Sequence, residues 1–417
     1  MAAIAGRPGQ TRRRAALGWF SLLVCVAVSA CGLPQRLTAV PENETTLAEI
    51  QGIPKARFFP ETQVDLLVRE TREAQEREIN ALATRGTAVS LPEADLLAIS
   101  GGGADGAFGA GVLAGWSNSG TRPVFKVVTG VSTGALTAPF AFLGPDWDKQ
   151  LDAVYTQIRP SDIFETRFLT AALWNDGLAD TSPLARLIAR YTDRRMLDAI
   201  AAEYQKGRLL FVGTTDIDAG RPVIWDMGAI AASGQAGALD LFRKILLASA
   251  AIPGFFPPVL IDVEVKGRGY QEMHVDGGTF TQMFLYPSGL NHAALFRRIK
   301  PRPVRVWLIR NGRFHPFWAN VDRRTLPIAE EAVSSMIQAS GMNDISQIYF
   351  ATERDGVDYN LAYIGSDFTT QAKEQFDPVY MRALYQYGYE KAIRGYPWAK
   401  RPPWIPEGQE TASPAIE

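Results

Sequence analysis

The sequence predicts an α/β domain whose central, mostly parallel sheet is covered by helices on both faces. Two observations support this prediction. Short apolar runs alternate with longer segments of helical character along most of the 417 residues, an order typical of a parallel or mixed sheet with helical crossovers. In addition, two glycine-rich elements, residues 101–106 and 130–134, each follow a strand-like run and open a helix-like segment.

The predicted strands are short, apolar and bounded by turn-forming residues. They comprise residues 95–100, 124–129, 208–214, 222–225, 259–265, 270–275, 304–309 and 359–364. The predicted helices either repeat apolar residues at helical spacing or are rich in small apolar residues. They comprise residues 61–83, 106–116, 133–142, 147–157, 183–191, 193–206, 240–250, 329–347 and 378–394.

One large domain, residues 91–395, is expected to hold this sheet and its helices. We expect a signal segment in residues 1–30, a polar, irregular tether in residues 31–60 and a charge-rich helical segment in residues 61–90. Residues 396–417 are rich in proline and polar residues and are expected to form a flexible tail. The formal net charge of -1 provides no basic field, so nucleic-acid binding is excluded.

The N-terminus has the features of an export signal. A basic run that ends at Arg14 precedes an apolar stretch over residues 15–28, which is too short for a comfortable transmembrane helix. Ser29 and Ala30 then precede Cys31, an order that resembles the lipobox of bacterial lipoproteins. The resemblance implies that Cys31 becomes the lipid-modified first residue of the mature chain. The alternative is an ordinary secretory signal with a chance cysteine.

The remaining cysteine and histidine content restricts the chemistry. Cys25 lies in the segment that would be removed, and the chain has three histidines with no metal-ligand spacing. No metal or other cofactor is therefore expected. By general lipoprotein sorting, Gly32 in place of Asp favours the periplasm-facing outer membrane, so we expect a lipid-anchored protein of the cell envelope. Export by the Sec or the twin-arginine route stays open.

A candidate nucleophile lies in the second glycine-rich element. Gly130-Val131-Ser132-Thr133-Gly134 fits the nucleophile-elbow pattern G-x-S-x-G, in which a serine occupies a tight turn between a strand and a helix. Gly130 and Gly134 allow the backbone to adopt that turn without a Cβ clash. Ser132 is therefore predicted to project its hydroxyl clear of the sheet.

The first glycine-rich element offers a place for a developing negative charge. Gly101, Gly102 and Gly103 present a run of backbone amides at the start of a helix, and such amides stabilise an oxyanion. A competing interpretation takes Gly101, Gly103 and Gly106 as a dinucleotide-binding fingerprint. That fingerprint requires an acidic residue about twenty positions further on, and residues 107–144 contain neither Asp nor Glu.

A serine nucleophile also requires a base. His292 and His315 are the histidines that follow every candidate acid, and each lies in a polar loop context. Asp276 is the other candidate, because it ends an apolar strand and is followed by Gly277 and Gly278. A buried carboxylate can deprotonate serine when burial raises its pKa towards neutrality. The alternative is that Asp276 only caps a turn.

Taken in order, three motifs resemble the patatin-like phospholipases. They are Gly101-Gly102-Gly103 before a helix, Gly130-Val131-Ser132-Thr133-Gly134, and Asp276-Gly277-Gly278. Residues 247–258 also resemble the Ala/Ser-rich helix and the following Pro/Phe turn of that family. The similarity covers roughly residues 96–278, with a weaker match in the C-terminal third.

The resemblance implies a three-layer α/β/α fold that hydrolyses acyl esters of lipids with a Ser-Asp dyad. Ser132 would be the nucleophile and Asp276 the base. The glycines of residues 101–103 would form the oxyanion hole, with amides from Gly102 and Gly103 and the turn shaped by Gly101. Gly106, Gly130, Gly134, Gly277 and Gly278 would support these motifs.

The chain departs from the family pattern at Asp105, where Arg or Lys is usual. A carboxylate cannot donate hydrogen bonds to an anion, so Asp105 is expected either to point away or to cap the helix that begins at Gly106. We expect a membrane-tethered acyl hydrolase that acts on lipid or phospholipid. The rival is a non-catalytic lipoprotein of the same fold that binds lipid or a protein partner, whose identity the sequence does not indicate.

Overall fold

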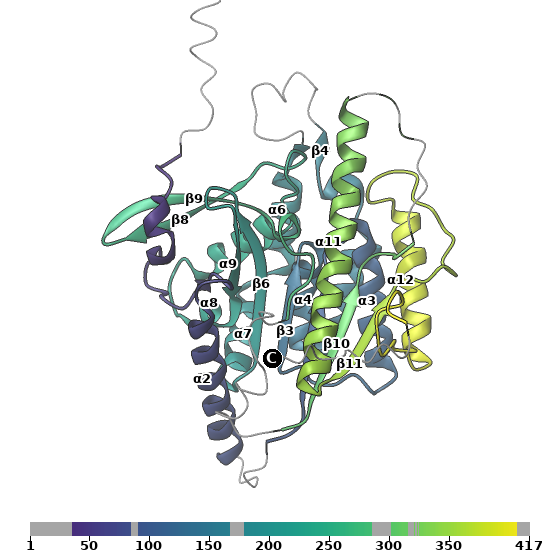
Figure 1. The fold of residues 1–417 in the computed structure, drawn as a ribbon, viewed down its shortest axis with the longest axis horizontal. Coiled ribbons are helices and arrows are strands. Elements are labelled where there is room, and N and C mark those ends of the chain that lie inside the picture. The colour runs from purple at the N-terminus through teal and green to yellow at the C-terminus, as the bar shows by residue number, and fades with distance from the viewer. Residues whose placement is uncertain are drawn as a thin grey trace, which may run out of the picture.

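The structure is a computed structural model (Figure 1) that describes residues 36–84, 91–166, 179–285, 302–315, 321, 323 and 325–406. The expected signal segment and Cys31 lie outside these residues. Within them, no helix combines the length and the apolar character needed to cross a membrane.

The core of the molecule is a mixed, mostly parallel sheet with the strand order β1-β7-β6-β3-β2-β10-β11. The strands are β1 (Arg57–Phe58), β2 (Ala94–Ile99), β3 (Val127–Val131), β6 (Leu209–Asp216), β7 (Arg221–Asp226), β8 (Val259–Val265), β9 (Arg268–Asp276), β10 (Val304–Arg310) and β11 (Asp358–Tyr363). The run from β11 through β10, β2 and β3 to β6 is parallel. The hairpin of β8 and β9 joins through an antiparallel pairing of β9 with β6. The predicted fold class is confirmed.

The helices match the predicted segments, except that the helix predicted over residues 329–347 extends beyond them at both ends. They are α2 (Val64–Ala83), α3 (Gly106–Asn118), α4 (Thr133–Leu143), α5 (Asp148–Thr156), α6 (Ser182–Tyr191), α7 (Arg194–Gln205), α8 (Met227–Ala232), α9 (Ala238–Ser249), α11 (Thr325–Asp355) and α12 (Pro378–Ile393). The short helix α8 was not expected, because six residues are too few to show helical periodicity. A two-stranded ribbon of β4 (Glu165–Thr166) and β5 (Ala179–Asp180) stands apart from the main sheet.

Helices cover both faces of the sheet, because its inner strands are apolar on both sides. On one face, Leu97 and Ile99 of β2 pack with buried side chains of α3, α4, α9 and α12. On the other face, Leu96 and Ala98 pack with Ile345 of α11. The helix α2 covers the same second face over β6 and β7. The molecule therefore has three layers, with the sheet between two layers of helices (Figure 1).

The glycines of α3 allow close packing against a neighbouring helix. A Cβ atom on Gly111 would lie 2.0 Å from the carbonyl oxygen of Tyr385 in α12, and one on Gly115 would lie 2.4 Å from that of Tyr389. The sequence predicted that this small-residue helix packs closely on the sheet. It does pack on the sheet, and these two glycines in addition bring its backbone close to that of α12.

Two terminal segments differ from the expectation of irregular, unattached chain. In the N-terminal segment, β1 joins the sheet edge at β7, and the amide of Gln271 in β9 donates to the carbonyl of Thr38 at 3.2 Å. At the C-terminal end, Ala399 bridges to Leu361 of β11. The reason is the same in both cases, because each segment provides hydrogen-bond partners for backbone groups of a strand that would otherwise be exposed.

Candidate active site

The end of β3 and the end of β9 meet along one edge of β6. Val131, the last residue of β3, pairs with Gly213 of β6. The next residue of β6, Thr214, pairs with Asp276, the last residue of β9. Because the two strands pair with neighbouring positions of β6, the sheet brings Ser132, which follows β3, next to Asp276. The sequence could not show this convergence, since β9 adds antiparallel to the strand beside β3.

The backbone of Ser132 has the strained conformation expected of a nucleophile elbow. Its φ is 55° and its ψ is -125° at the start of α4, a combination that costs about 1–3 kcal/mol for a residue with a side chain. The two flanking glycines are required by packing. A Cβ on Gly130 would lie 2.4 Å from the carbonyl oxygen of Gly134, and one on Gly134 would lie 2.2 Å from that of Ile99.

A serine of α9 holds this strained turn in place. The amide of Ser132 donates to Oγ of Ser249 at 2.9 Å. The same hydroxyl donates to the carbonyl oxygen of Gly213 at 2.7 Å. Ser249 is fully buried and so links α9, the elbow and β6. No sequence pattern indicated this role, beyond the position of Ser249 in an Ala/Ser-rich helix.

The side chains of Ser132 and Asp276 form a hydrogen-bonded pair. Both residues are buried, and the Ser132 hydroxyl is a hydrogen-bond partner of the Asp276 carboxyl. Burial raises the pKa of Asp276 to about 7, although hydrogen bonds from Ser132 and from the amide of Gly278 oppose the increase. The Gly278 amide lies 2.7 Å from Oδ1 of Asp276. A carboxyl with this pKa is suited to accept a proton near neutral pH.

The first glycine-rich loop lies on the other side of Ser132. A Cβ on Gly101 would lie 3.2 Å from Cβ of Ser132, so the loop is in contact with the elbow. The amide of Gly101 donates to the carbonyl of Gln282 at 3.1 Å and is therefore not free to bind an oxyanion. In the described part of the chain, the amides of Gly102 and Gly103 have no internal hydrogen-bond acceptor. These two amides are the ones that were expected to donate to an oxyanion, and Gly101 was expected only to shape the turn.

Asn311, directly after β10, holds the residue that precedes this loop, Ser100, by two hydrogen bonds. Its Nδ2 donates to the carbonyl of Ser100 at 2.9 Å, and its amide donates to Oγ of Ser100 at 2.9 Å. A Cβ on Gly102, whose φ is 154°, would lie only 2.0 Å from the carbonyl oxygen of Asn311. The next glycine, Gly103, has a φ of 55° and open space around its Cβ position. Gly102 is therefore required by packing and Gly103 by backbone conformation.

Residues 97–286 match the patatin-like phospholipase family. The chain has no significant match among curated proteins. Among solved structures, the crystal structure of VipD from Legionella pneumophila shares 14% sequence identity, with a TM-score of 0.35, over 73% of this chain and 67% of that chain. The family match ends before β10, so β10, α11, β11 and α12 lie beyond it.

At this site Asp105 points away from the loop amides. Its carboxyl accepts a hydrogen bond from the hydroxyl of Tyr380 in α12 at 2.5 Å, and it makes no capping bond to the start of α3. Burial raises the pKa of Asp105, although Tyr380, Arg313 and Arg310 oppose the increase. Of the two expected orientations, pointing away is confirmed and capping is wrong.

None of the histidines that the structure describes lies against Ser132 and Asp276 as a base. His315 is exposed, and His292 lies outside the described residues. The third, His274, is fully buried on β9 and contacts Thr214 and Glu272. The described partner of the Ser132 hydroxyl is therefore the carboxyl of Asp276.

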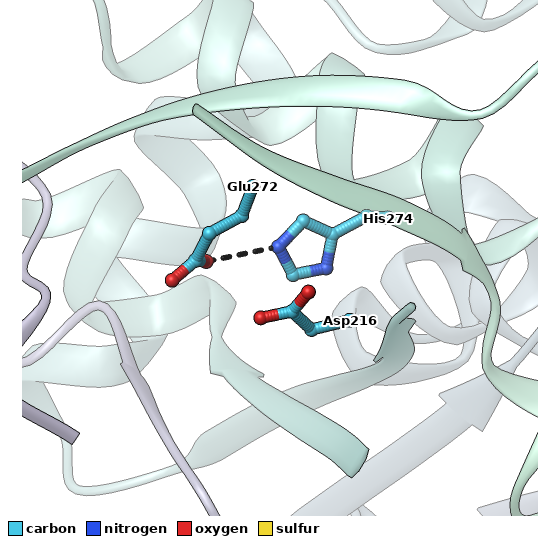
Figure 2. A group of neighbouring side chains, drawn as sticks. All are labelled: Asp216, Glu272 and His274. Carbon is cyan, nitrogen blue, oxygen red and sulfur yellow. Dashed lines mark hydrogen bonds and ion pairs between the residues drawn. The ribbon is translucent and has the colours of Figure 1, made fainter. Parts of the chain in front are cut away.

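His274 is part of a buried polar cluster with Asp216 and Glu272 (Figure 2), whose candidate ligand atoms all lie within 4.8 Å of one another. Nε2 of His274 lies 3.2 Å from the Glu272 carboxylate, and Nδ1 lies 3.0 Å from Oγ1 of Thr214. The sequence did not indicate this cluster, because Asp216 lies on β6 whereas Glu272 and His274 lie on β9, and the two strands are far apart in the chain.

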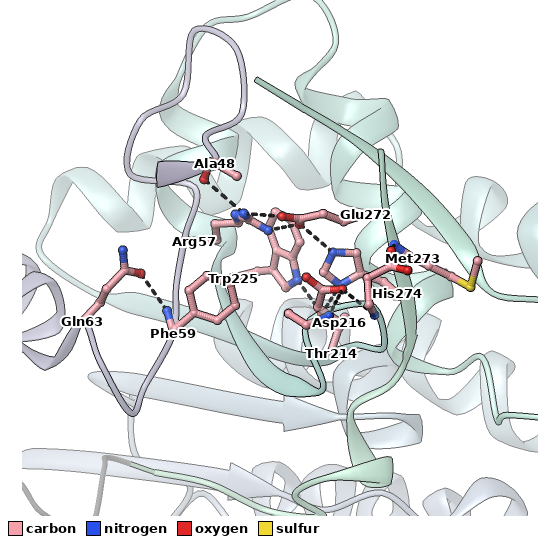
Figure 3. A network of polar contacts seen from close by, with 12 residues as sticks. Ala48, Arg57, Phe59, Gln63, Thr214, Asp216, Trp225, Glu272, Met273 and His274 are labelled. Carbon is pink, nitrogen blue, oxygen red and sulfur yellow. Dashed lines mark hydrogen bonds and ion pairs between the residues drawn. The ribbon is translucent and has the colours of Figure 1, made fainter. Parts of the chain in front are cut away.

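An arginine pairs with one of the two carboxylates of this cluster. Figure 3 shows Arg57 of β1 beside Glu272, and the guanidinium donates to both carboxylate oxygens. Although burial opposes ionisation, Arg57 and His274 lower the pKa of Glu272 to about 2. The cluster is therefore an ion-paired network that fastens β1 to β9, the strand that carries Asp276.

Proposed function

We propose that the chain is a serine-dependent lipid acyl hydrolase of the phospholipase A or esterase type. The observation that carries this proposal is the hydrogen-bonded pair of Ser132 and Asp276 at the convergent ends of β3 and β9. The match to the patatin-like phospholipase family, whose name implies lipid ester hydrolysis, supports the same reaction class.

In the proposed reaction, Oγ of Ser132 attacks the ester carbonyl carbon while Asp276 accepts the hydroxyl proton. The amides of Gly102 and Gly103 bind the resulting oxyanion, and one such donor is worth about 2.7–4 kcal/mol of barrier. The C–O bond to the alcohol then breaks, and Asp276 returns its proton to the leaving oxygen. The product of this half-reaction is an acyl-enzyme on Ser132.

The second half-reaction uses the same groups. Asp276, again ionised, accepts a proton from water as the water oxygen attacks the acyl carbon. The tetrahedral intermediate collapses, the bond to Oγ of Ser132 breaks, and the serine recovers its proton from Asp276. The fatty acid leaves. No group other than water is consumed, so the proposal needs no cofactor.

An apolar pocket beside the dyad supports a lipid substrate. It has a volume of about 140 Å³. Its wall includes Val131 and Gly277, the immediate chain neighbours of Ser132 and Asp276, and is formed mainly by apolar side chains such as Met283, Leu285 and Ile348. Its polar members are Thr214, Thr281, Asp344 and Gln347. Apolar walls of this kind suit the hydrocarbon part of a ligand.

The test is hydrolysis of a short-chain chromogenic ester and of phosphatidylcholine by the mature protein. Ser132→Ala and Asp276→Asn should each reduce the rate by about a thousandfold or more, while Ser182→Ala, an exposed serine at the start of α6, should leave it unchanged. A fluorophosphonate probe should label the wild type and not Ser132→Ala. Equal rates in all variants would refute the proposal.

The same probe separates the proposal from the non-catalytic rival, a lipoprotein that binds lipid or a protein partner. The main support for that rival was Asp105, and its carboxyl is bound to Tyr380 away from the loop amides. A protein that binds vesicles but is never labelled would favour the rival.

We further propose that the chain is anchored in the cell envelope through lipid on Cys31. The support is the sequence alone: a basic run, a short apolar stretch, and Ser29-Ala30 before Cys31-Gly32. Several acyl chains on one cysteine suffice for stable anchoring, because each buried CH₂ contributes about 0.8 kcal/mol. Radiolabelled palmitate should enter the wild type and not Cys31→Ser, and only the wild type should fractionate with the outer membrane.

A further inference from the structure

Gln282 lies between the two loops that build the proposed site. Its carbonyl oxygen accepts from the amide of Gly101 at 3.1 Å, and its Nε2 donates to the carbonyl of Gly278 at 3.0 Å. A Cβ on Gly101 would lie 2.6 Å from Oε1 of Gln282, and one on Gly278 would lie 2.1 Å from its Nε2. Gln282 is buried. It therefore sets the separation between the oxyanion loop and the turn that follows Asp276.

Asp344 in turn holds Gln282. Its Oδ2 accepts from the amide of Gln282 at 2.6 Å and from the amide of Met283 at 3.1 Å. A carboxylate that accepts two consecutive amides is a strong, charge-assisted clamp. Met283 is itself buried, so this segment is held by apolar packing of its side chain as well as by the carboxylate of Asp344.

Asp344 is supplied by a rigid element beyond the family match. It lies on α11, which runs along the sheet beside β10 (Figure 1) and packs on it through the buried Ile345 and Ile348. The matched region ends at residue 286, so the clamp on the patatin-like loops comes from the chain that follows that region.

The charge of Asp344 is balanced by a neighbour on the sheet. Burial raises its pKa to about 6, although the two amides and Arg310 of β10 oppose the increase. Arg310 is buried, and in the described chain its Nε and Nη1 have no hydrogen-bond partner. Its guanidinium also faces Asp105. Asp344 therefore has one cation near it and is ionised above about pH 6.

We propose that Asp344 is a positioning residue for the acyl transfer: through Gln282 it holds the oxyanion loop and the Asp276 turn at their working separation. The inference rests on the proposed function for its kinetic consequence. Its structural content, that one carboxylate of α11 orders two distant loops, stands without that function.

The test compares Asp344→Ala, Asp344→Asn and, as a matched control, Asn343→Ala, an exposed neighbour on α11. Turnover of a soluble ester by Asp344→Ala should fall about 10–100-fold in kcat, with KM nearly unchanged. Asparagine keeps an acceptor oxygen without the charge, so Asp344→Asn should lose only part of kcat, and it covers the case in which the alanine variant fails to fold. Asn343→Ala should match the wild type.

Two readouts separate positioning from a general loss of stability. Asp344→Asn should be less active than the wild type near about pH 8 and should approach it near about pH 5, because the wild-type carboxyl is then also neutral. Amide hydrogen exchange in residues 100–105 and 278–285 should rise together in Asp344→Ala and not in the control. This second readout holds even if the wild type proves inactive, which would refute the proposed function alone. Unchanged exchange with wild-type kcat in both Asp344 variants would overturn the inference.

Discussion

The amide of Ser132 donates to Oγ of Ser249 at 2.9 Å, and that hydroxyl in turn donates a hydrogen bond to the carbonyl oxygen of Gly213 at 2.7 Å. One side chain of α9 thus satisfies a buried donor on the elbow and a buried acceptor on β6. The elbow is strained, and Ser249 is one of the contacts that hold it in this conformation.

Ser249→Ala should therefore weaken both folding and catalysis. Two buried backbone groups would lose their partner, which costs about 1–3 kcal/mol each when nothing replaces it. We expect a lower melting temperature and a kcat reduced about tenfold as the elbow relaxes. Ser233→Ala, which removes a hydroxyl that contacts only the carbonyl of Ile230 and the amide of Gln235 close by in the chain, is the control for both measurements. A Ser249→Ala protein that labels with fluorophosphonate at the wild-type rate would show that the elbow does not need this support.

Much of the fold was accessible from local pattern. Apolar runs predicted every strand that carries a proposed catalytic group, and the glycine spacing around Ser132 and Asp276 predicted the turns that hold them. These signals are local because a strand or a tight turn constrains residues that are neighbours in the chain.

The supporting residues were not accessible in this way. Ser249, Gln282, Asn311 and Asp344 act through hydrogen bonds between segments that are distant in sequence, and none of them belongs to a repeating pattern. A polar side chain in an apolar helix gives no indication of which loop it will meet. That information exists only once β9 has paired with β6 and α11 has packed on the sheet.

Activity should rise with pH through about 7, because Asp276 must be ionised to accept the serine proton. The same carboxyl should lower stability as the pH rises. Its pKa is raised from 3.8 in the unfolded chain to about 7 in the fold, so its contribution is fully favourable below about pH 4 and is lost as the pH passes about 7.

Asp276→Asn does not titrate, so its stability relative to the wild type should improve between about pH 5 and about pH 8. Chemical denaturation at these two values measures the difference. A variant that gains nothing over this interval would mean that Asp276 is not held in a desolvated site.

The two central glycines of the first loop should respond differently to substitution. Gly102→Ala places a Cβ 2.0 Å from the carbonyl oxygen of Asn311, so the loop must move and ester hydrolysis should fall by about a hundredfold or more. In Gly103→Ala the new Cβ enters open space, and the only penalty is the positive φ of 55°. For a residue with a side chain this conformation costs about 1 kcal/mol. The rate of fluorophosphonate labelling and the melting temperature, measured on both variants, separate the two effects. Equal losses in the two variants would contradict this difference.

The pair of Arg57 and Glu272 (Figure 3) should matter for stability rather than for metal binding. Removal of one partner leaves a buried charge alone, so Arg57→Met and Glu272→Gln should each destabilise the protein by about 3–5 kcal/mol. The double variant Arg57→Met/Glu272→Met should be more stable than the Arg57→Met protein, because no unpaired charge stays buried in it. Treatment with a chelator should leave the melting temperature of the wild type unchanged, since Arg57 already pairs with the Glu272 carboxylate of the cluster of Asp216, Glu272 and His274. A fall in melting temperature on chelation, restored by added Zn²⁺, would show instead that these side chains hold a metal ion.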